Sequence, residues 1–285
     1  MRMRFMSKRS RHTTKSDTKP AALVDVIIPV YGRFDLLKQC LNALPEAFGD
    51  ISYKVYVFDN ASPNKDEANK FYETYNNFTL ARAKENLGFP RACNLTFGKG
   101  TSPLVFFLNS DVILDPGSMS HLVRGMDDPR VGIAGMKLIF PEHTDLPQDD
   151  VQRPAGKVQH IGISTNIRAE VFHQFLGWSE DHPKVKAMSD VYAVTGAALM
   201  TRRWLFQQAG KFNEAYGKGT YEDIEYCLTV RKMGYNTVVV NDARGIHHTG
   251  ASAVTYQVSY PMNENRVIFL QKWQKILDWD EVNHW

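Results

Sequence analysis

The stretch LVFFLNSDVIL (Leu104–Leu114) contains a run of five apolar residues that is followed at once by the polar residues Asn109 to Asp111. A short apolar run of this length, bounded by polar residues, is typical of a buried strand. Asp111 would then lie at the carboxyl end of that strand, where open α/β sheets bind their ligands. The stretch therefore predicts a strand that brings one carboxylate, and an asparagine two residues before it, to the edge of a sheet.

The rest of the first half alternates short apolar runs with helical patterns. Strands are predicted at 23–30, 53–58, 78–83 and 103–108, and helices at 33–44, 66–75 and 91–97. Strands that alternate with helices favour right-handed crossovers and a mostly parallel sheet. We therefore expect an α/β fold, in which the polar or glycine-rich turns after the strands outline one rim of a site.

The second half is less regular. It predicts a loop at 141–154, a strand or strand pair at 191–201, a helix at 220–233, a strand at 236–240, a loop at 245–252 and a terminal helix at 263–277. No internal repeat and no low-complexity linker interrupts it. We therefore expect one continuous domain at 21–285 that follows a tail at 1–20.

Positive charge is concentrated in the tail. The chain has 285 residues, of which 43% are hydrophobic, and a net charge of +3. The tail holds seven Lys or Arg residues and one acid, which leaves the body with a net negative charge. Nucleic acid is therefore not an expected partner of the body. The tail itself predicts either a disordered, solvated extension or a contact with an anionic surface.

Two patterns bear on the cellular compartment. No run of about 18 apolar residues is present and the tail lacks the apolar core of a signal peptide, so we expect neither a membrane span nor a leader. Cys40, Cys93 and Cys227 are an odd number without CxxC spacing. This argues against a disulfide framework and a thiolate zinc site, and a reducing cytosol is the expected compartment.

Asp111 and the adjacent pair His247 and His248 are candidate metal ligands. A hard divalent cation that binds phosphates needs few protein ligands, and imidazole suits Mn²⁺ better than Mg²⁺. Asn109 points to the same side as Asp111 if the strand pleat continues, but its amide oxygen contributes no charge. Spacing alone leaves two other interpretations open: Asp111 as an ordinary turn residue, and the histidines as part of a surface loop.

Glu222 and Asp223 follow a glycine-containing loop, Gly217-Lys218-Gly219. One of these carboxylates could act as a general base at the start of a helix beside a mobile loop. The alternative is structural, because Thr220 followed three residues later by Asp223 resembles a capping box. No P-loop, no glycine motif for dinucleotides after the first strand and no nucleophile elbow is present. Phosphate binding would therefore have to go through a metal.

Seven blocks in one order give the chain a resemblance to a known family. They are PVY (29–31), FDNAS (58–62), ENLGFPRACN (85–94), FLNSD (107–111), VTGAALMTRR (194–203), YEDIEYCLTVRKMGY (221–235) and HHTGAS (247–252). Together they resemble glycosyltransferase family 2 over about residues 23–275, and most of all its rhamnosyltransferase-like bacterial and phage members, whose metal motif often reads Asn-x-Asp. The resemblance implies the GT-A fold and transfer with inversion from a nucleotide-diphospho-sugar.

The resemblance assigns the donor side of the site by position. Pro29 and Tyr31 would flank the nucleobase, and Asp59 would bond the base or the ribose. Asn86 and Gly88 would lie against the nucleotide. The implied donor is a UDP- or dTDP-sugar, held by residues 21–115, which would form the nucleotide-sugar half of the domain.

The resemblance also implies a site for Mn²⁺ or Mg²⁺. Asn109 and Asp111 stand at the metal motif, with Asp111 as the ligand. His247 or His248 would complete the site, and His247 is favoured because it directly follows the apolar run that leads into its loop. Many relatives have Asp at the position of Asn109, so this chain would have one carboxylate fewer near the metal.

Residues 116–262 would form the acceptor and catalytic half, followed by a C-terminal helix at 263–285. The resemblance places the catalytic base at Asp223 and an acceptor-orienting role at Glu222. Gly196 and Ala197 would correspond in position to the strand that lies beneath the acceptor and sugar site. The expected reaction is a single in-line displacement by a hexosyltransferase-type enzyme.

The acceptor is the least defined part of this interpretation. We expect a glycan, a lipid-linked acceptor or another polymer, as in polysaccharide biosynthesis, with peripheral contact of the terminal helix with a membrane as one option. Two alternative functions stay open: a module that binds nucleotide-sugars without transfer, and a sugar nucleotidyltransferase.

Overall fold

The structure is a computed structural model, and it describes residues 22–145, 154–165 and 170–274. The predicted tail at 1–20, most of the predicted loop at 141–154 and the end of the predicted terminal helix lie outside the described residues. Among the described helices, none is long and apolar enough to cross a bilayer.

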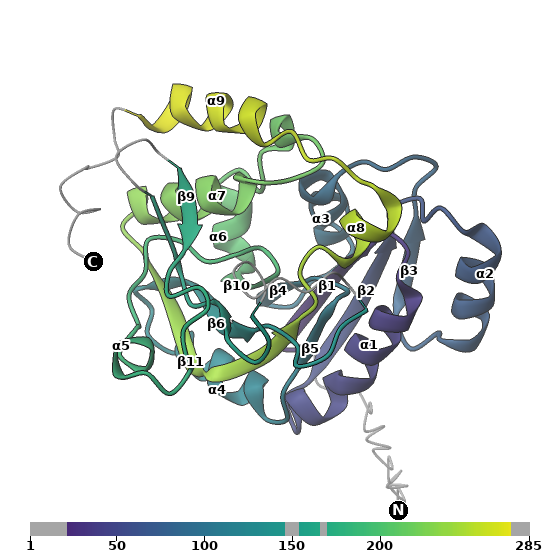
Figure 1. The fold of residues 1–285 in the computed structure, drawn as a ribbon, viewed down its shortest axis with the longest axis horizontal. Coiled ribbons are helices and arrows are strands. Elements are labelled where there is room, and N and C mark those ends of the chain that lie inside the picture. Colours follow the sequence, from purple (N-terminus) through teal and green to yellow (C-terminus); the bar gives the residue numbers. More distant parts are fainter. Residues whose placement is uncertain (1–21, 146–153, 166–169, 275–285) are drawn as a thin grey trace, which may run out of the picture.

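The chain alternates strands and helices through its first half and becomes less regular afterwards (Figure 1). The strands are β1 (Val24–Val30), β2 (Tyr53–Asp59), β3 (Thr79–Arg82), β4 (Leu104–Leu108), β5 (Val112–Leu114), β6 (Val131–Ile139), β7 (Val158–His160), β8 (Ile163–Thr165), β9 (Val171–His173), β10 (Ala198–Arg202) and β11 (Asn236–His247). The helices are α1 (Phe34–Phe48), α2 (Lys65–Thr74), α3 (Phe89–Phe97), α4 (Ser118–Gly125), α5 (Pro183–Lys186), α6 (Arg203–Gln208), the 3₁₀ turn η1 (Glu214–Tyr216), α7 (Glu222–Lys232), α8 (Ala251–Tyr256) and α9 (Met262–Trp273).

One mixed sheet runs through the molecule in the order β3-β2-β1-β4-β10-β6-β11-β5, with β7 paired to β6. Strands β1 to β4 are parallel neighbours, β6 and β11 are also parallel, and β10 lies antiparallel between β4 and β6. The predicted α/β fold with a mostly parallel sheet is confirmed. Strands β8 and β9 form a separate two-stranded sheet.

This topology brings the ends of strands from both halves of the sequence to one edge of the sheet. Because β10 is antiparallel to both of its neighbours, β6 and β11 run in the same direction as β4. The carboxyl end of β11 therefore lies at the same edge as the carboxyl ends of β1, β2 and β4. There His247, the last residue of β11, pairs with Val112 of β5, which directly follows Asp111.

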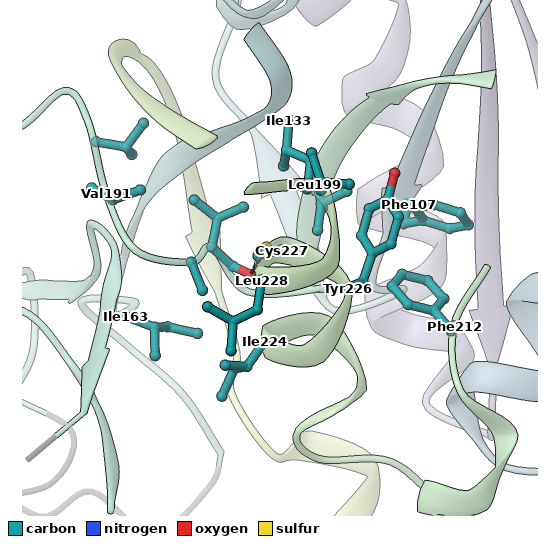
Figure 2. Packing of buried hydrophobic residues seen from close by; sticks show 14 of the residues in the cluster. Phe107, Ile133, Ile163, Val191, Leu199, Phe212, Ile224, Tyr226, Cys227 and Leu228 are labelled. Carbon is teal, nitrogen blue, oxygen red and sulfur yellow. Dashed lines mark hydrogen bonds between the residues drawn. The ribbon is translucent and has the colours of Figure 1, made fainter. Parts of the chain in front are cut away.

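Strand β4 is buried on both faces, which explains its unbroken apolar run. Val105 and Phe107 belong to the hydrophobic cluster on one face of the sheet. The alternate residues of β4 belong to the cluster on the other face, with side chains of α1 and α4. The first cluster contains most of the buried side of α7. Figure 2 shows Ile224 and Leu228 near Ile163, and Tyr226 near Phe107 and Phe212.

Several predicted elements in the second half were wrong in extent. Strand β11 continues to His247, although the sequence predicted its end at 240 and a loop from 245. Of the predicted strand at 191–201, only the end from Ala198 is in β10. Strand β6 was not predicted, although all of its residues are buried. Its glycines interrupt the run of apolar residues that marks a buried strand. They allow close packing, because a Cβ on Gly135 would overlap the side chain of Val194.

Candidate active site

A pocket of about 140 Å³ opens at the carboxyl edge of the sheet. Five of the residues predicted to bind substrate or metal line it, and they come from three separate parts of the sequence: Pro29, Tyr31, Asn86, Asn109 and Asp111. The strand ends thus do outline one rim, as expected for parallel strands. Asn60, Phe89, Lys218 and Tyr260 also line the pocket, and the sequence did not single them out.

One wall of the pocket is formed by the turn after β1 and by α8. The backbone N–H of Arg33 donates to Tyr256 Oη at 3.2 Å. The ring of Tyr256 lies edge-on to that of Tyr31, with 5.6 Å between centroids. Gly32 has φ of 67°, and a Cβ there would overlap the Tyr256 ring. Only glycine therefore fits at this point, and α8 supplies part of the pocket wall.

Asn60 connects the end of β2 to the turn that contains Asn86. Its Nδ2 donates to Asn86 Oδ1 at 3.0 Å, and its Oδ1 accepts from the backbone N–H of Leu87 at 2.8 Å. The neighbouring Asp59 is buried, and its two oxygens accept from the Ser62 backbone N–H and from Arg82 Nε. A role of Asp59 toward base or ribose stays a prediction. The signal for Asn60 was its position beside Asp59 at a strand end.

Asp111 lines the pocket, and His247 faces Asp111 from the end of β11. His247 Nε2 lies 3.4 Å from Asp111 Oδ1, and both residues are buried. His247 Nδ1 lies 3.2 Å from Gln159 Oε1 and 3.2 Å from Thr249 Oγ1. Because an amide oxygen only accepts hydrogen bonds, the contact with Gln159 favours the tautomer with its proton on Nδ1, in which the Nε2 lone pair faces Asp111.

This pair fits a divalent cation. His247 Nε2 has no hydrogen-bond partner among the described residues, although it is buried. An unpartnered buried nitrogen beside a carboxylate oxygen is the arrangement that two ligands of one cation adopt. No group of three or more His, Cys, Asp or Glu side chains within the described ranges could hold a metal. Two protein ligands suit a cation that also binds phosphate oxygens and water.

His248 is placed differently from His247. Its backbone N–H donates to the Asp111 carbonyl oxygen at 3.0 Å, which holds the turn after β4 against the end of β11. Its Nδ1 is buried without a hydrogen-bond partner in the described part of the chain. Burial is the main cause that lowers the pKa of His248 below its ordinary value. The geometry toward Asp111 Oδ1 favours His247 as the ligand.

Asp223, in the first turn of α7, is not among the residues that line the pocket, but a Cβ on Gly196 would touch both its side chain and the pocket residue Phe89. Its Oδ2 accepts from the Gly196 backbone N–H at 2.8 Å, and its Oδ1 accepts from the Ile224 backbone N–H at 2.8 Å. The next residue, Ala197, accepts through its carbonyl oxygen from the Asn109 backbone N–H at 2.8 Å. Two hydrogen bonds therefore connect the carboxylate of Asp223 to the turn that holds Asp111.

The structure corrects the predicted capping box. The residue before α7 is Tyr221, and no side chain caps the helix. Thr220 and Tyr221 both have left-handed backbone conformations, with φ of 81° and 72°. The Asp223 carboxylate bonds the Gly196 N–H instead, and the Thr220 hydroxyl contacts α9, where Asn265 Nδ2 lies 2.9 Å from its Oγ1.

Burial raises the pKa of both acidic residues at the start of α7. For Glu222 the pKa lies well above the ordinary value, mainly through loss of solvation and secondly through the Asp223 charge. For Asp223, burial raises the pKa, and the hydrogen bonds from Gly196 and Ile224 oppose this effect. Glu222 Oε2 has no partner among the described residues. A carboxylate with a raised pKa is suited to accept a proton.

Comparison with known proteins reveals sequence relatives. The model described as "Glycosyl transferase family 2" matches residues 25–205. An uncharacterised protein, y4gI of Sinorhizobium fredii, is 26% identical over 81% of this chain and 25% of its own length. The O-antigen biosynthesis protein RfbC of Myxococcus xanthus is 26% identical over 80% of this chain and 17% of its own length. The chain thus spans a quarter or less of these two relatives.

Solved structures share the fold at low sequence identity. GalNAc-T7 with UDP, GalNAc and Mn²⁺ superposes with a TM-score of 0.65 and 13% identity, over 90% of this chain and 48% of that one. The mannosyltransferase PcManGT from Pyrobaculum calidifontis, in complex with GDP-Man and Mn²⁺, gives 0.55 and 15%, over 90% and 71%. TarS 1–349 from S. aureus with UDP-GlcNAc gives 0.56 and 14%, over 90% and 68%. These likenesses show that the fold is GT-A.

Proposed function

The chain belongs to glycosyltransferase family 2, and we propose that it transfers a sugar with inversion from a nucleoside-diphospho-sugar to an acceptor hydroxyl. The observation that carries the proposal is that the Asp111–His247 pair, of which Asp111 lines the pocket, is linked to the buried Asp223 carboxylate through Gly196, Ala197 and Asn109. The Asp111–His247 pair can hold a cation that binds the leaving diphosphate. Asp223 can take a proton from the acceptor.

The donor would lie along the carboxyl edge of the sheet. Tyr31 lines the pocket and would stack on a nucleobase, and Asn60 holds the side-chain amide of Asn86, which also lines the pocket. Lys218 brings a positive charge to the pocket lining, which favours a donor with phosphates. We propose a UDP- or dTDP-sugar, and UDP-GlcNAc is the first probe because the relative from Bradyrhizobium diazoefficiens, 29% identical over 77% of this chain, is an N-acetylglucosaminyltransferase.

Asp111 Oδ1 and His247 Nε2 would hold Mn²⁺ or Mg²⁺, with Asn109 in the same turn. When bound, such a cation supplies positive charge where negative charge grows on the leaving diphosphate. The histidine favours Mn²⁺ of the two. Gln159 supports this role because it keeps the Nε2 of His247 free of a proton.

Asp223 would accept the proton of the acceptor hydroxyl. The two backbone N–H groups that bond its carboxylate fix its orientation, and burial raises its pKa toward the range of a useful base. Burial raises the pKa of Glu222 well above its ordinary value, and its unpartnered Oε2 would orient an acceptor. An acceptor oxygen that attacks the anomeric carbon opposite the diphosphate gives inversion without a covalent enzyme intermediate.

The acceptor is proposed to be a glycan or a lipid-linked sugar, by analogy with the relatives. Release of UDP from UDP-GlcNAc with Mn²⁺ tests transfer or donor hydrolysis, and a thermal-shift screen of nucleotide-sugars identifies the donor. A shift without nucleotide release for every donor would indicate a binding module. Pyrophosphate formed from a nucleoside triphosphate and a sugar 1-phosphate would indicate a nucleotidyltransferase. Either result would overturn the proposal.

A further inference from the structure

Asn265 of α9 is buried and bonds the loop that leads into α7. Its side chain is 1% exposed. The Nδ2 atom lies 3.0 Å from the Tyr216 carbonyl oxygen, 2.7 Å from that of Gly219 and 2.9 Å from Thr220 Oγ1. The Thr220 carbonyl oxygen lies 3.2 Å away as well, so the two N–H groups of one amide are shared among four acceptors along one short loop.

The loop needs such support because its backbone is unfavourable. Gly217, Gly219, Thr220 and Tyr221 all have positive φ. For the last two this conformation costs free energy, because the side chain crowds the following carbonyl. The four residues fold this way directly before the helix that begins with Glu222 and Asp223. Contacts from outside the loop must therefore hold it, and those of Asn265 are the most numerous hydrogen bonds that one described side chain makes to it.

The same loop also contacts the donor side. The backbone N–H of Phe89 donates to the Lys218 carbonyl oxygen at 3.1 Å. A Cβ on Gly88 would overlap the Gly217 carbonyl group, so the two turns lie in close contact. The loop thus lies between the turn after Asn86 and the carboxylate of Asp223. A change in its position would alter the distance between donor and base.

We propose that Asn265 is a positioning residue that sets the place of the Glu222–Asp223 carboxylates relative to the donor. The proposal rests on the proposed function of Asp223 as the base. An amide suits this position because its N–H groups face carbonyl and hydroxyl oxygens. A carboxylate of the same shape would place oxygen against oxygen and drive the loop away.

Helix α9 has other anchors, so the role can be separated from folding. Phe269 and Trp273 are buried in the hydrophobic core, and the Phe269 ring lies 5.2 Å from that of Tyr221. Asn263, on the exposed side of the same helix, offers a matched control. The variants are Asn265→Ala and Asn265→Asp, with Asn263→Asp as the control.

The kinetic experiment measures UDP release from UDP-GlcNAc and Mn²⁺. For Asn265→Asp we expect kcat to fall about a hundredfold, and at least as far as for Asn265→Ala, while KM stays within about threefold. The acidic limb of the pH profile of Asn265→Ala should also move to lower pH, because a loosened loop lets water reach the Asp223 carboxylate. Wild-type kcat in Asn265→Asp, or an equal effect in Asn263→Asp, would overturn the proposal.

Hydrogen exchange of residues 216–224 tests the loop independently of any activity. Faster exchange in Asn265→Asp than in Asn263→Asp supports the inference, and equal exchange overturns it. If the wild-type protein releases no UDP from any donor, the proposed function fails, but the exchange measurement still decides whether Asn265 holds the loop. Asn265→Ala, which introduces no repulsion, serves if the aspartate variant does not fold.

Discussion

His247 Nε2 lies 3.4 Å from Asp111 Oδ1, although the two residues come from β11 and from the turn after β4. The separation exceeds that of a strong charge-assisted hydrogen bond, about 2.8 Å. It is close to the spacing of two ligands that share one cation. Gln159 holds the opposite side of the ring, so the arrangement does not depend on a salt bridge between the two residues.

Replacement of His247 by alanine should remove most of the effect of Mn²⁺ on nucleotide binding. Calorimetry with UDP, with and without Mn²⁺, measures this effect. His248→Ala is the matched control and should keep the metal effect, because the contact of His248 with Asp111 uses its backbone. Loss of the metal effect in His248→Ala alone would exchange the two assignments.

Gln159→Leu should weaken Mn²⁺ binding without a large loss of stability. The leucine removes the acceptor that fixes the proton on His247 Nδ1, and loss of such a partner typically costs about tenfold to a hundredfold in metal affinity. Gln159→Glu should retain binding, because a carboxylate also accepts from Nδ1. Electron paramagnetic resonance of free Mn²⁺ gives the affinities, and equal values for Leu and Glu would contradict the prediction.

Asp223→Asn should abolish UDP release while UDP and Mn²⁺ still bind. The amide keeps an oxygen for the Gly196 N–H but cannot accept the proton. In the wild-type protein, activity should rise with pH through a pKa above that of an ordinary aspartate, because burial raises it and the base acts when deprotonated. A pH profile that is flat from acidic to neutral pH would contradict this assignment.

Arg203→Met should destabilise the fold by about 3 kcal/mol or more. Arg203 Nη2 lies 2.6 Å from Asp25 Oδ2, and the Asp25 side chain is 1% exposed. Without the guanidinium, the carboxylate stays buried with only Ser102 as a donor among the described residues. Urea unfolding measures the loss, and Asp25→Asn in the same chain should recover part of it. Arg91→Met, at an exposed pair, should cost less than about 1 kcal/mol.

The fold should lose stability as the pH falls below about 6.5. Burial lowers the pKa of His173 to about 4 and that of His160 well below its ordinary value. Below about pH 6.5 these two histidines bind protons in the unfolded chain but stay neutral in the folded chain until the pH nears their lowered pKa values. Unfolding is therefore favoured as the pH falls. Urea unfolding without metal at pH 7.5 and 5 tests this. His173→Leu should reduce the dependence on pH.

The first half of the fold followed from the sequence, because its signals are local. Strands β1 to β4 begin and end within two residues of their predicted bounds, and parallel strands then bring their polar ends together. Asp111 could be placed at the pocket by this rule alone. The roles assigned to Asp223 and His247 came from the resemblance to a family, since spacing alone favoured a capping box and a surface loop.

The parts that were missed depend on contacts between distant positions. Gln159 and His247 are separated by 88 positions, and Asn265 lies 46 positions after the loop residue Gly219. No periodicity marks a side chain whose partner is so far away. At Thr220 a local pattern predicted a helix cap that does not form. Its hydroxyl instead contacts Asn265, which is distant in the sequence.

The ring of Tyr256 occupies the space that a side chain at position 32, where the chain has glycine, would need. One wall of the pocket that we propose for the donor is therefore a short helix, α8, which rests on the turn after β1 and belongs to no strand of the sheet. If the release of a nucleotide requires α8 to move off this turn, we expect the time of that movement to set an upper limit on turnover.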